Sequence, residues 1–388
     1  AADNIISTKY KDVVKHEETF EETFIGVKGE VHGSVVDAAN KYEKIGRKAE
    51  QEEMDVDAGL TVAQAAGDIS NALMNDAIGG SVSIGLSHVS ETGSSFSTHD
   101  NINYISGGKI NISSNKDTVL KGVEVNADDV QINTGGDFSL SAAESTLSES
   151  SSGSTFNVGV SAGYGVGPAG SGGGVSVDYS GSNNRSSTES TGYANASITA
   201  NNLSVNSGND ITLAGANLVA DRADVKAAGD LSIQSVQSQS GSTASSEHWG
   251  GSVGVAITTT GLIPTGAIHA GGGSENHLDN TVAQQSGIHT AGTLTVQTGG
   301  DINLTGSHLI SDSGTGSVEA GGAVNAKEIT DIVDSRGTYG GGGGGMSYKG
   351  TPIVNGYVDT LDTIHREEIQ HSTINVGINK GEVQGKLN

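Results

Sequence analysis

The 388-residue sequence has no cysteine, only three prolines, few aromatic residues and no long hydrophobic run. Without cysteine there is no disulfide framework and no thiolate metal site. Aromatic residues make up 4% and apolar residues 34% of the chain, which is too little material for one large globular core. No apolar run approaches the ~18 residues of a membrane-spanning helix. We therefore expect a thin, elongated molecule with a narrow interior.

Positive charge is also scarce: the chain has 20 Lys and Arg residues and 45 Asp and Glu residues, which gives a net charge of −25. Nucleic-acid binding requires a basic stripe, and none occurs. The eleven histidines are scattered without zinc-ligand spacing, and we expect most of them in solvated polar loops. No neighbourhood combines a nucleophile, a base and an orienting group. The sequence therefore predicts no enzymatic activity, no catalytic residue, no metal site and no cofactor.

One short phrase occurs three times, at residues 109–122, 202–215 and 293–306, without a gap. A long period of this kind indicates that one structural unit is used repeatedly. We assign the leucines to the core, the glycines to corners with positive φ, and the aspartates to corners where each carboxylate bonds its own backbone. The residues so assigned are Asp117, Leu120, Gly122, Asp210, Leu213, Gly215, Asp301, Leu304 and Gly306.

A shorter period lies inside the long one. Val205 and Asp210 recur twenty residues later as Val225 and Asp230, whereas the third unit slips to twenty-two. Apolar residues alternate within each short run, so one face points inward. A turn of about twenty residues cannot bury that face alone, and stacking turns solves the problem. This pattern predicts a parallel β-solenoid; a β-sandwich is the competing interpretation.

Glycine-rich excursions interrupt the stacked turns. The predicted division is 1–30, the end of a preceding repeat unit; 31–76, a helical insertion; 77–106, a Gly/Ser-rich β-hairpin and return; 107–147, solenoid turns; 148–198, a Gly-rich hairpin; 199–239, solenoid turns; 240–291, a Gly-rich hairpin; 292–334, solenoid turns; and 335–388, a Gly-rich excursion and the start of the next turn.

The insertion shows helical apolar spacing over Val31–Glu52 and again over Gly59–Asp76. Two helices in a hairpin would either cap an open end of the solenoid or bind a partner.

The excursions alternate apolar residues with glycine and serine, which predicts β-hairpins with one apolar face. Three contacts could cover that face: the hairpins could pack on each other, associate with another protein through their open edges, or contact lipid. The residues predicted to make membrane or partner contact are Val82, Ile84, Leu86, Phe156, Val158, Val160, Tyr164, Val175, Val177, Tyr179, Trp249, Val253, Val255 and Ile257.

The stretch Asn201–Glu247 resembles the haemagglutinin repeat of large Gram-negative two-partner-secretion exoproteins, which include filamentous haemagglutinins and the effector proteins of contact-dependent growth inhibition. The hairpin sequences SVSIGLS and GGSVGVAI are also similar to that repeat, as is the charged insertion before the first hairpin. The first copy of its G-x-D-φ-x-L-x-G element departs from the pattern at Asn115 and Thr118.

This resemblance implies a mainly β fold, a right-handed parallel β-helix with protruding Gly-rich amphipathic β-hairpins. It also implies a protein at the surface of a Gram-negative bacterium, exported through an outer-membrane secretion partner barrel. The function expected from it is contact with a target-cell outer membrane or outer-membrane protein in support of toxin delivery. A plain filamentous adhesin or biofilm-matrix segment is the alternative, and neighbouring chains or a second copy are further partners. The chain begins without Met and in mid-pattern, so we expect it to be a fragment.

Overall fold

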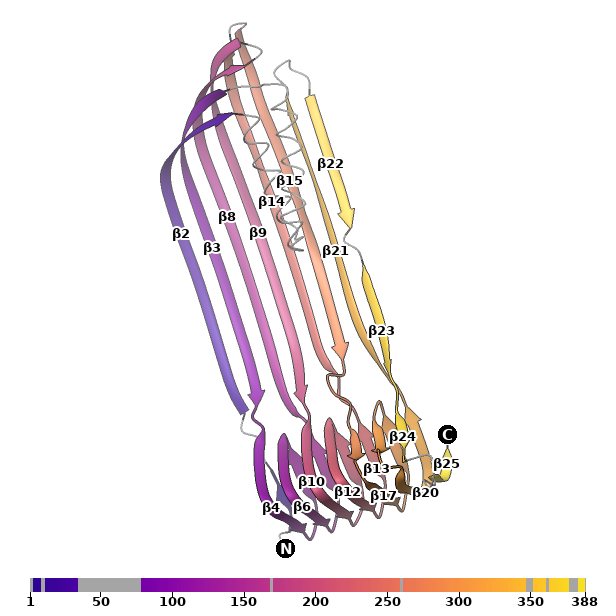
Figure 1. Ribbon diagram of the computed structural model, residues 1–388. Helices are drawn as coiled ribbons and strands as arrows, with labels where there is room; N and C mark the ends of the chain where they lie inside the picture. Colours follow the sequence, from indigo (N-terminus) through magenta and orange to yellow (C-terminus); the bar gives the residue numbers. More distant parts are fainter. Residues whose placement is uncertain are drawn as a thin grey trace.

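The computed structural model describes residues 3–7, 11–33, 78–167, 170–258, 261–346, 352–360, 363–376 and 383–387. These residues form two β-sheets, one parallel and one antiparallel, so the prediction of a mainly β protein is confirmed. Figure 1 shows a coil of short strands at one end and long strands that rise from it. The described residues include no helix long and apolar enough to cross a membrane.

The parallel sheet has sixteen strands and curls back on itself; we call it the stack. In the first four turns a long strand is followed by a short one. In the fifth turn the long strand is divided into two strands, and in the sixth turn β20 covers both the second part of the long strand and the position of the short one. The strands are β1 (Ile5–Ile6), β4 (Asn103–Ser114), β5 (Thr118–Lys121), β6 (Val123–Thr134), β7 (Phe138–Ser141), β10 (Ala196–Ser207), β11 (Ile211–Ala214), β12 (Ala216–Ala227), β13 (Leu231–Gln234), β16 (Gly287–Thr290), β17 (Thr293–Thr298), β18 (Ile302–Thr305), β19 (His308–Ser311), β20 (Thr315–Lys327), β24 (Thr373–Asn375) and β25 (Val383–Leu387).

Equivalent residues of successive turns pair in register. Val205 of β10 lies between Ile132 of β6 and Val225 of β12, and all three side chains are buried. The inward residues of every turn thus form one continuous apolar core inside the stack. Alternation along each strand supplies this core, because every second side chain of a pleated strand points to the same side.

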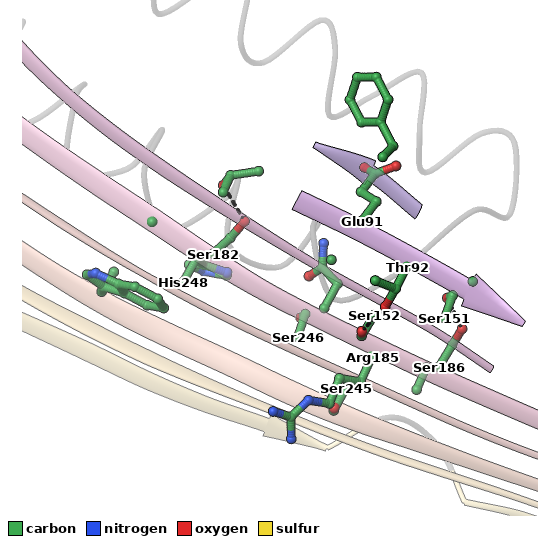
Figure 2. A pocket seen from close by; sticks show the side chains of 18 of the residues that line it. Glu91, Thr92, Ser151, Ser152, Ser182, Arg185, Ser186, Ser245, Ser246 and His248 are labelled. Atoms are coloured by element: carbon green, nitrogen blue, oxygen red, sulfur yellow. Dashed lines mark hydrogen bonds between the residues drawn. The ribbon is translucent and has the colours of Figure 1, made fainter. Parts of the chain in front are cut away.

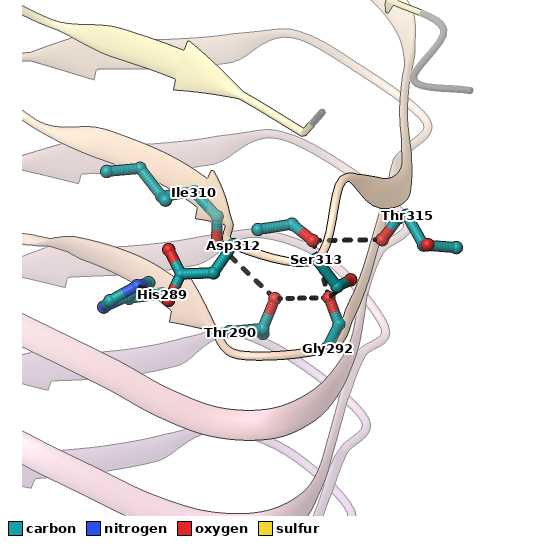
Figure 3. A network of polar contacts seen from close by, with 8 residues as sticks. His289, Thr290, Gly292, Ile310, Asp312, Ser313 and Thr315 are labelled. Carbon is teal, nitrogen blue, oxygen red and sulfur yellow. Dashed lines mark hydrogen bonds and ion pairs between the residues drawn. The ribbon is translucent and has the colours of Figure 1, made fainter. Parts of the chain in front are cut away.

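The third repeat unit accommodates its two additional residues at corners. β17 pairs with β20 at the expected offset, with Val296 opposite Val318. Figure 3 shows the corner between β19 and β20, where the hydroxyl groups of Ser311 and Ser313 donate to the carbonyl oxygen of Gly292 at 2.6 and 2.8 Å. Gly314 adopts a φ of 69° there, a conformation that glycine reaches without steric cost.

The antiparallel sheet, which we call the blade, is built from the excursions between turns. Its strands are β2 (Lys11–Gly33), β3 (Ile78–Asp100), β8 (Ala143–Gly167), β9 (Gly170–Ala194), β14 (Ser238–Thr258), β15 (Gly261–Thr281), β21 (Ile329–Met346), β22 (Pro352–Thr360) and β23 (Ile364–Gln370). They pair in the order β2-β3-β8-β9-β14-β15-β21-β22, with β23 also on β21. Each hairpin therefore pairs with the next, and the blade is one sheet that extends away from the stack (Figure 1).

Two details differ from the sequence-based expectations. Val31–Gly33, expected to open a helix, are the last residues of β2, and the rest of the predicted helical insertion lies outside the described residues. Except for His371, the histidines lie in strands and not in loops. For the histidines of the blade, the surrounding sequence resembles loops because the strands carry polar residues on both faces near the stack, so the usual contrast of apolar and polar positions is missing there.

Candidate functional site

The repeated aspartates form a ladder along one corner of the stack. The Oδ1 atom of Asp117 accepts a hydrogen bond from the backbone N–H of Asp137 at 2.9 Å, and Asp210 accepts from Asp230 at 2.8 Å. Asp137 and Asp230 continue the series, accepting from the N–H groups of Asp210 and Asp301 at 3.2 and 2.7 Å. Each carboxylate thus bonds the next turn, and not its own backbone as the sequence suggested, so the ladder ties the turns together.

The repeated leucines and glycines also hold equivalent positions. Leu120, Leu213 and Leu304 are 3%, 0% and 1% exposed and belong to the core of the stack. The corner glycines have positive φ angles, which favour glycine. These angles are 58° at Gly122, 63° at Gly215 and 54° at Gly306.

The predicted contact residues gather on one face of the blade, which we call face A. Residues directly opposite in neighbouring strands share a face of a sheet. The register places Leu86 opposite Val158, Val158 opposite Tyr179, and Val177 opposite Val253. All fourteen predicted residues hold face A positions by this register, across β3, β8, β9 and β14. The side chains of Val82 and Tyr164 lie outside the described set.

Face A is exposed to water over its half toward the hairpin tips, the distal half. Its exposed apolar side chains are between 37% and 84% accessible. Within the described strands, the register leaves every face A position from the tips to the level of Trp249 free of Asp, Glu, Lys and Arg. The fifteen exposed apolar residues of this half are Ile25, Ile84, Leu86, Phe156, Val160, Val175, Val177, Tyr179, Val253, Val255, Ile257, Leu262, Ile268, Met346 and Val354.

Aromatic rings of face A lie over glycines of the neighbouring strand. Trp249 of β14 is opposite Gly181 of β9, where an added Cβ would lie 2.6 Å from the indole Cζ2. Two residues away the roles are exchanged, and a Cβ on Gly251 would lie 2.9 Å from the Tyr179 Oη. Glycine at these positions therefore gives the rings room to lie flat on the sheet, where they cover backbone that would otherwise be bare.

The opposite face of the distal half, face B, carries small and polar residues. Ser161, Ser176 and Asp178 lie there and bond one another, with 2.6 Å between the two hydroxyl oxygens. Phe24 is an exception, since it lies on face B and is 62% exposed. The blade thus has one apolar and one mainly hydrophilic surface in its distal half.

The half of the blade nearer the stack, the proximal half, is hydroxyl-rich on both faces. A hollow of about 990 Å³ lies along it, and Figure 2 shows serine and threonine side chains from several strands around it. Many of these hydroxyls pair across strands, as Thr92 does with Ser152 at 2.8 Å and Ser151 with Ser186 at 2.7 Å. Such self-paired groups offer a polar surface.

The contact set predicted from the sequence missed several face A residues. Ile25 of β2, Leu262 and Ile268 of β15, and Val354 and Val358 of β22 extend the apolar surface toward both edges of the blade. Alternation around Leu262 and Ile268 was a usable signal, although Pro264 and Gly266 between them hide it.

Two histidines have shifted pKa values. Burial, and then the neighbouring His289, lower the pKa of His308 from its usual 6.5. The hydrogen bond and charge of Asp334 raise the pKa of His365, whose Nδ1 lies 2.5 Å from the carboxylate. Among the described residues no group of three or more His, Asp or Glu side chains could hold a metal ion.

The family model described as "Hemagglutinin repeat" matches residues 35–144, 78–250 and 237–338. The chain is 29% identical over 346 residues to "Filamentous hemagglutinin" of Bordetella pertussis (strain Tohama I), covering 85% of this chain and 10% of that protein. It is 26% identical over 385 residues to "Protein adenylyltransferase and cysteine protease IbpA" of Histophilus somni (strain 2336), covering 98% of this chain and 9% of that protein. The chain thus spans about a tenth of the length of these relatives. No solved structure matches it.

Proposed function

Because this chain belongs to the hemagglutinin repeat family, we propose that it is a structural and interaction segment of a large secreted surface exoprotein of a Gram-negative bacterium. In this proposal the stack is a right-handed parallel β-helix that forms part of a stalk. The blade contacts the outer membrane of a target cell through face A and supports delivery of a toxin located elsewhere in the exoprotein. The segment itself performs no catalysis.

The observation that carries the proposal is the uncharged apolar surface of face A on an otherwise acidic and polar protein. An exposed apolar patch of fifteen side chains is a binding surface or an aggregation hazard. Alternating apolar residues run from Trp249 to Ile257 and from Phe156 to Val166, close to the ~10 residues with which a β-strand matches the depth of a bilayer core. Trp249 and Tyr179 lie at the lower border of this surface, as aromatic residues do at membrane–water interfaces.

Toxin delivery rests on the resemblance to growth-inhibition effectors and on the relatives. The Histophilus somni relative is named for two enzymatic activities, while the part similar to this chain is 9% of it. A non-catalytic segment that brings another region to a membrane fits such an arrangement.

Vesicle flotation tests the membrane contact. We expect the purified chain to float with vesicles of outer-membrane lipids, and Trp249, its single tryptophan, to be quenched by brominated lipid. Replacing Val158, Val160, Val253 and Val255 by serine should abolish both signals, because it removes apolar area from the centre of face A. A control with Ser87→Ala and Ser252→Ala on face B should bind as the wild type does. Failure of the wild-type chain to float would reject the membrane contact.

A plain adhesin is the second candidate, and the hydroxyl-rich proximal half of the blade favours it. In that case the valine-to-serine variant should leave attachment to cells unchanged, since the polar surface is untouched. Loss of target-cell inhibition with intact attachment, measured in an exoprotein that carries this variant, would instead favour delivery.

A further inference from the structure

The structure leaves a large apolar surface facing water in a protein that is secreted under the proposed function. We propose that two copies cover this surface for each other, face A against face A, before the protein meets a membrane. The inference deepens the proposed function, because it concerns the same face and names a second copy of this chain as its partner in water.

The available area is sufficient for a specific dimer. Full burial of one aliphatic side chain removes on the order of 100 Å² of apolar surface from water. The fifteen exposed apolar residues of face A are on average roughly half exposed, so each copy offers on the order of 700 Å². Stable protein interfaces of standard size bury about 800 Å² per partner. The backbone and small residues between these side chains would add to the total.

The charge distribution suits a self-complementary interface. In a two-fold dimer every residue of the patch meets the same patch on the partner, so any charge in it would face a like charge or be buried without a partner. Among the described residues, the distal half of face A has no Asp, Glu, Lys or Arg, whereas Asp178 lies on face B and Glu247 lies below the level of Trp249. Face A of one copy can thus be buried against face A of a second copy without leaving an unpaired charge in the interface.

The edges of the blade disfavour the other route to association. Edge strand β2 carries Glu17, Glu18, Glu21 and Glu22 in its middle, and β23 carries Glu367 and Glu368. The other edge strand, β22, begins with Pro352, which cannot donate a ladder hydrogen bond, and carries Asp359. Charged side chains on edge strands oppose the addition of another strand. Acidic edges would meet acidic edges, so a second copy is directed to the uncharged face.

Face-to-face packing also completes the architecture of the blade. Sheets in water bury their apolar face against a second layer, and two sheets pack about 10 Å apart with interdigitated side chains. Two blades would form such a two-layer sandwich. The mainly hydrophilic face B of each copy would remain outside, in contact with water.

A pair of neighbouring substitutions tests the inference. Val253 and Ser252 are adjacent in β14 but lie on faces A and B, and Val253 is 68% exposed. We expect the wild-type chain to sediment as a dimer at ~10 µM, since interfaces of this size bind at micromolar affinity or better. Val253→Asp should weaken the dimer at least about a hundredfold, because each copy would bury an unpaired carboxylate. Ser252→Asp should leave the dimer intact.

Trp249 supplies a second measurement that needs no variant. Its emission should shift to shorter wavelength, and its quenching by acrylamide should fall, as the wild-type chain is concentrated through the dimer transition. A monomer at every concentration, or a dimer that Val253→Asp leaves intact, would overturn the inference. So would a monomer whose Trp249 is shielded at all concentrations, because face A would then be covered by the same chain.

Flotation separates this inference from the proposed function. A wild-type chain that floats with lipid but is monomeric in buffer refutes the dimer alone. A chain that dimerises in buffer but never floats refutes the membrane contact alone.

Discussion

The aspartate ladder predicts that Asp210→Ala and Asp210→Asn will differ in stability. Asp210 Oδ1 accepts the backbone N–H of Asp230 at 2.8 Å, and the Asp210 N–H donates to Asp137 Oδ1 at 3.2 Å. Alanine removes the acceptor and leaves the partly buried Asp230 N–H unsatisfied, which costs about 1–3 kcal/mol. Asparagine keeps an oxygen at that position and so retains a neutral hydrogen bond.

The change to asparagine also relieves repulsion in the ladder. Carboxylates on stacked strands are about 4.8 Å apart, and Asp210 has such a neighbour on each side, Asp137 and Asp230. In a water-like dielectric at physiological salt the two repulsions together amount to roughly 1 kcal/mol. A charge-assisted hydrogen bond exceeds a neutral one by a similar amount, about 1 kcal/mol. The two effects of Asp210→Asn therefore nearly cancel, and its free energy of unfolding should lie within about 1 kcal/mol of the wild type.

Urea unfolding followed by far-ultraviolet circular dichroism measures both effects. Asp210→Ala should unfold about 1–3 kcal/mol more easily than Asp210→Asn. Added salt should change the difference between wild type and Asp210→Asn, because salt screens the repulsion. It should not change the difference between the two variants, which are both uncharged at this position. Equal stability of the alanine and asparagine variants would show that the ladder hydrogen bonds do not hold the turns together.

Three further outcomes are expected from the stack. Leu213→Ala should lower the free energy of unfolding by about 2–5 kcal/mol, since this leucine is fully buried, while the outward Thr212→Ala in the same strand should change it by less than about 0.5 kcal/mol in urea titrations. Gly215→Ala should cost at least about 1–2 kcal/mol by thermal denaturation, because φ is 63° and the new methyl would lie 2.6 Å from Val236 Cγ2. Because the pKa of His308 is lowered in the folded chain, His308 takes up a proton in the unfolded chain at a higher pH than in the folded chain. The stabilising contribution of neutral His308 is therefore complete above pH 6.5 and declines as the pH falls below that value. His308→Gln should flatten the pH dependence of the melting temperature between pH 7 and pH 5, and an unchanged slope would contradict this assignment.

Much of the stack could be predicted from sequence because its information is local and repeated. Alternation assigns the inward side of each strand, and the recurrence of Leu120, Leu213 and Leu304 fixes which residues lie above one another. The slip from twenty to twenty-two residues in the third unit is likewise found in the register of β17 and β20. The positive φ of Gly215 follows from the demand of a tight corner for a residue without Cβ.

The partners of single side chains were less accessible to sequence reasoning. A repeated aspartate at a corner suggests a bond to a nearby backbone group, but local geometry alone cannot say whether that group is in the same turn or the next. The stacking distance decided it, since Asp210 Oδ1 reaches the N–H of Asp230 in the turn that follows. The glycine opposite Trp249 is also distant in sequence, and only the pairing of β9 with β14 brings Gly181 under the indole.

Sequence patterns alone establish that the chain is mainly β, that its turns recur, and that each hairpin has an apolar side. A period of two within strands and a fixed offset between units are sufficient for these conclusions. The three-dimensional fold was needed to show that the hairpins join edge to edge and that their apolar sides all point the same way. The register between neighbouring hairpins depends on the positions at which the long strands leave and rejoin the stack. A shift of one residue would have placed Val253 and Val177 on opposite faces of the blade.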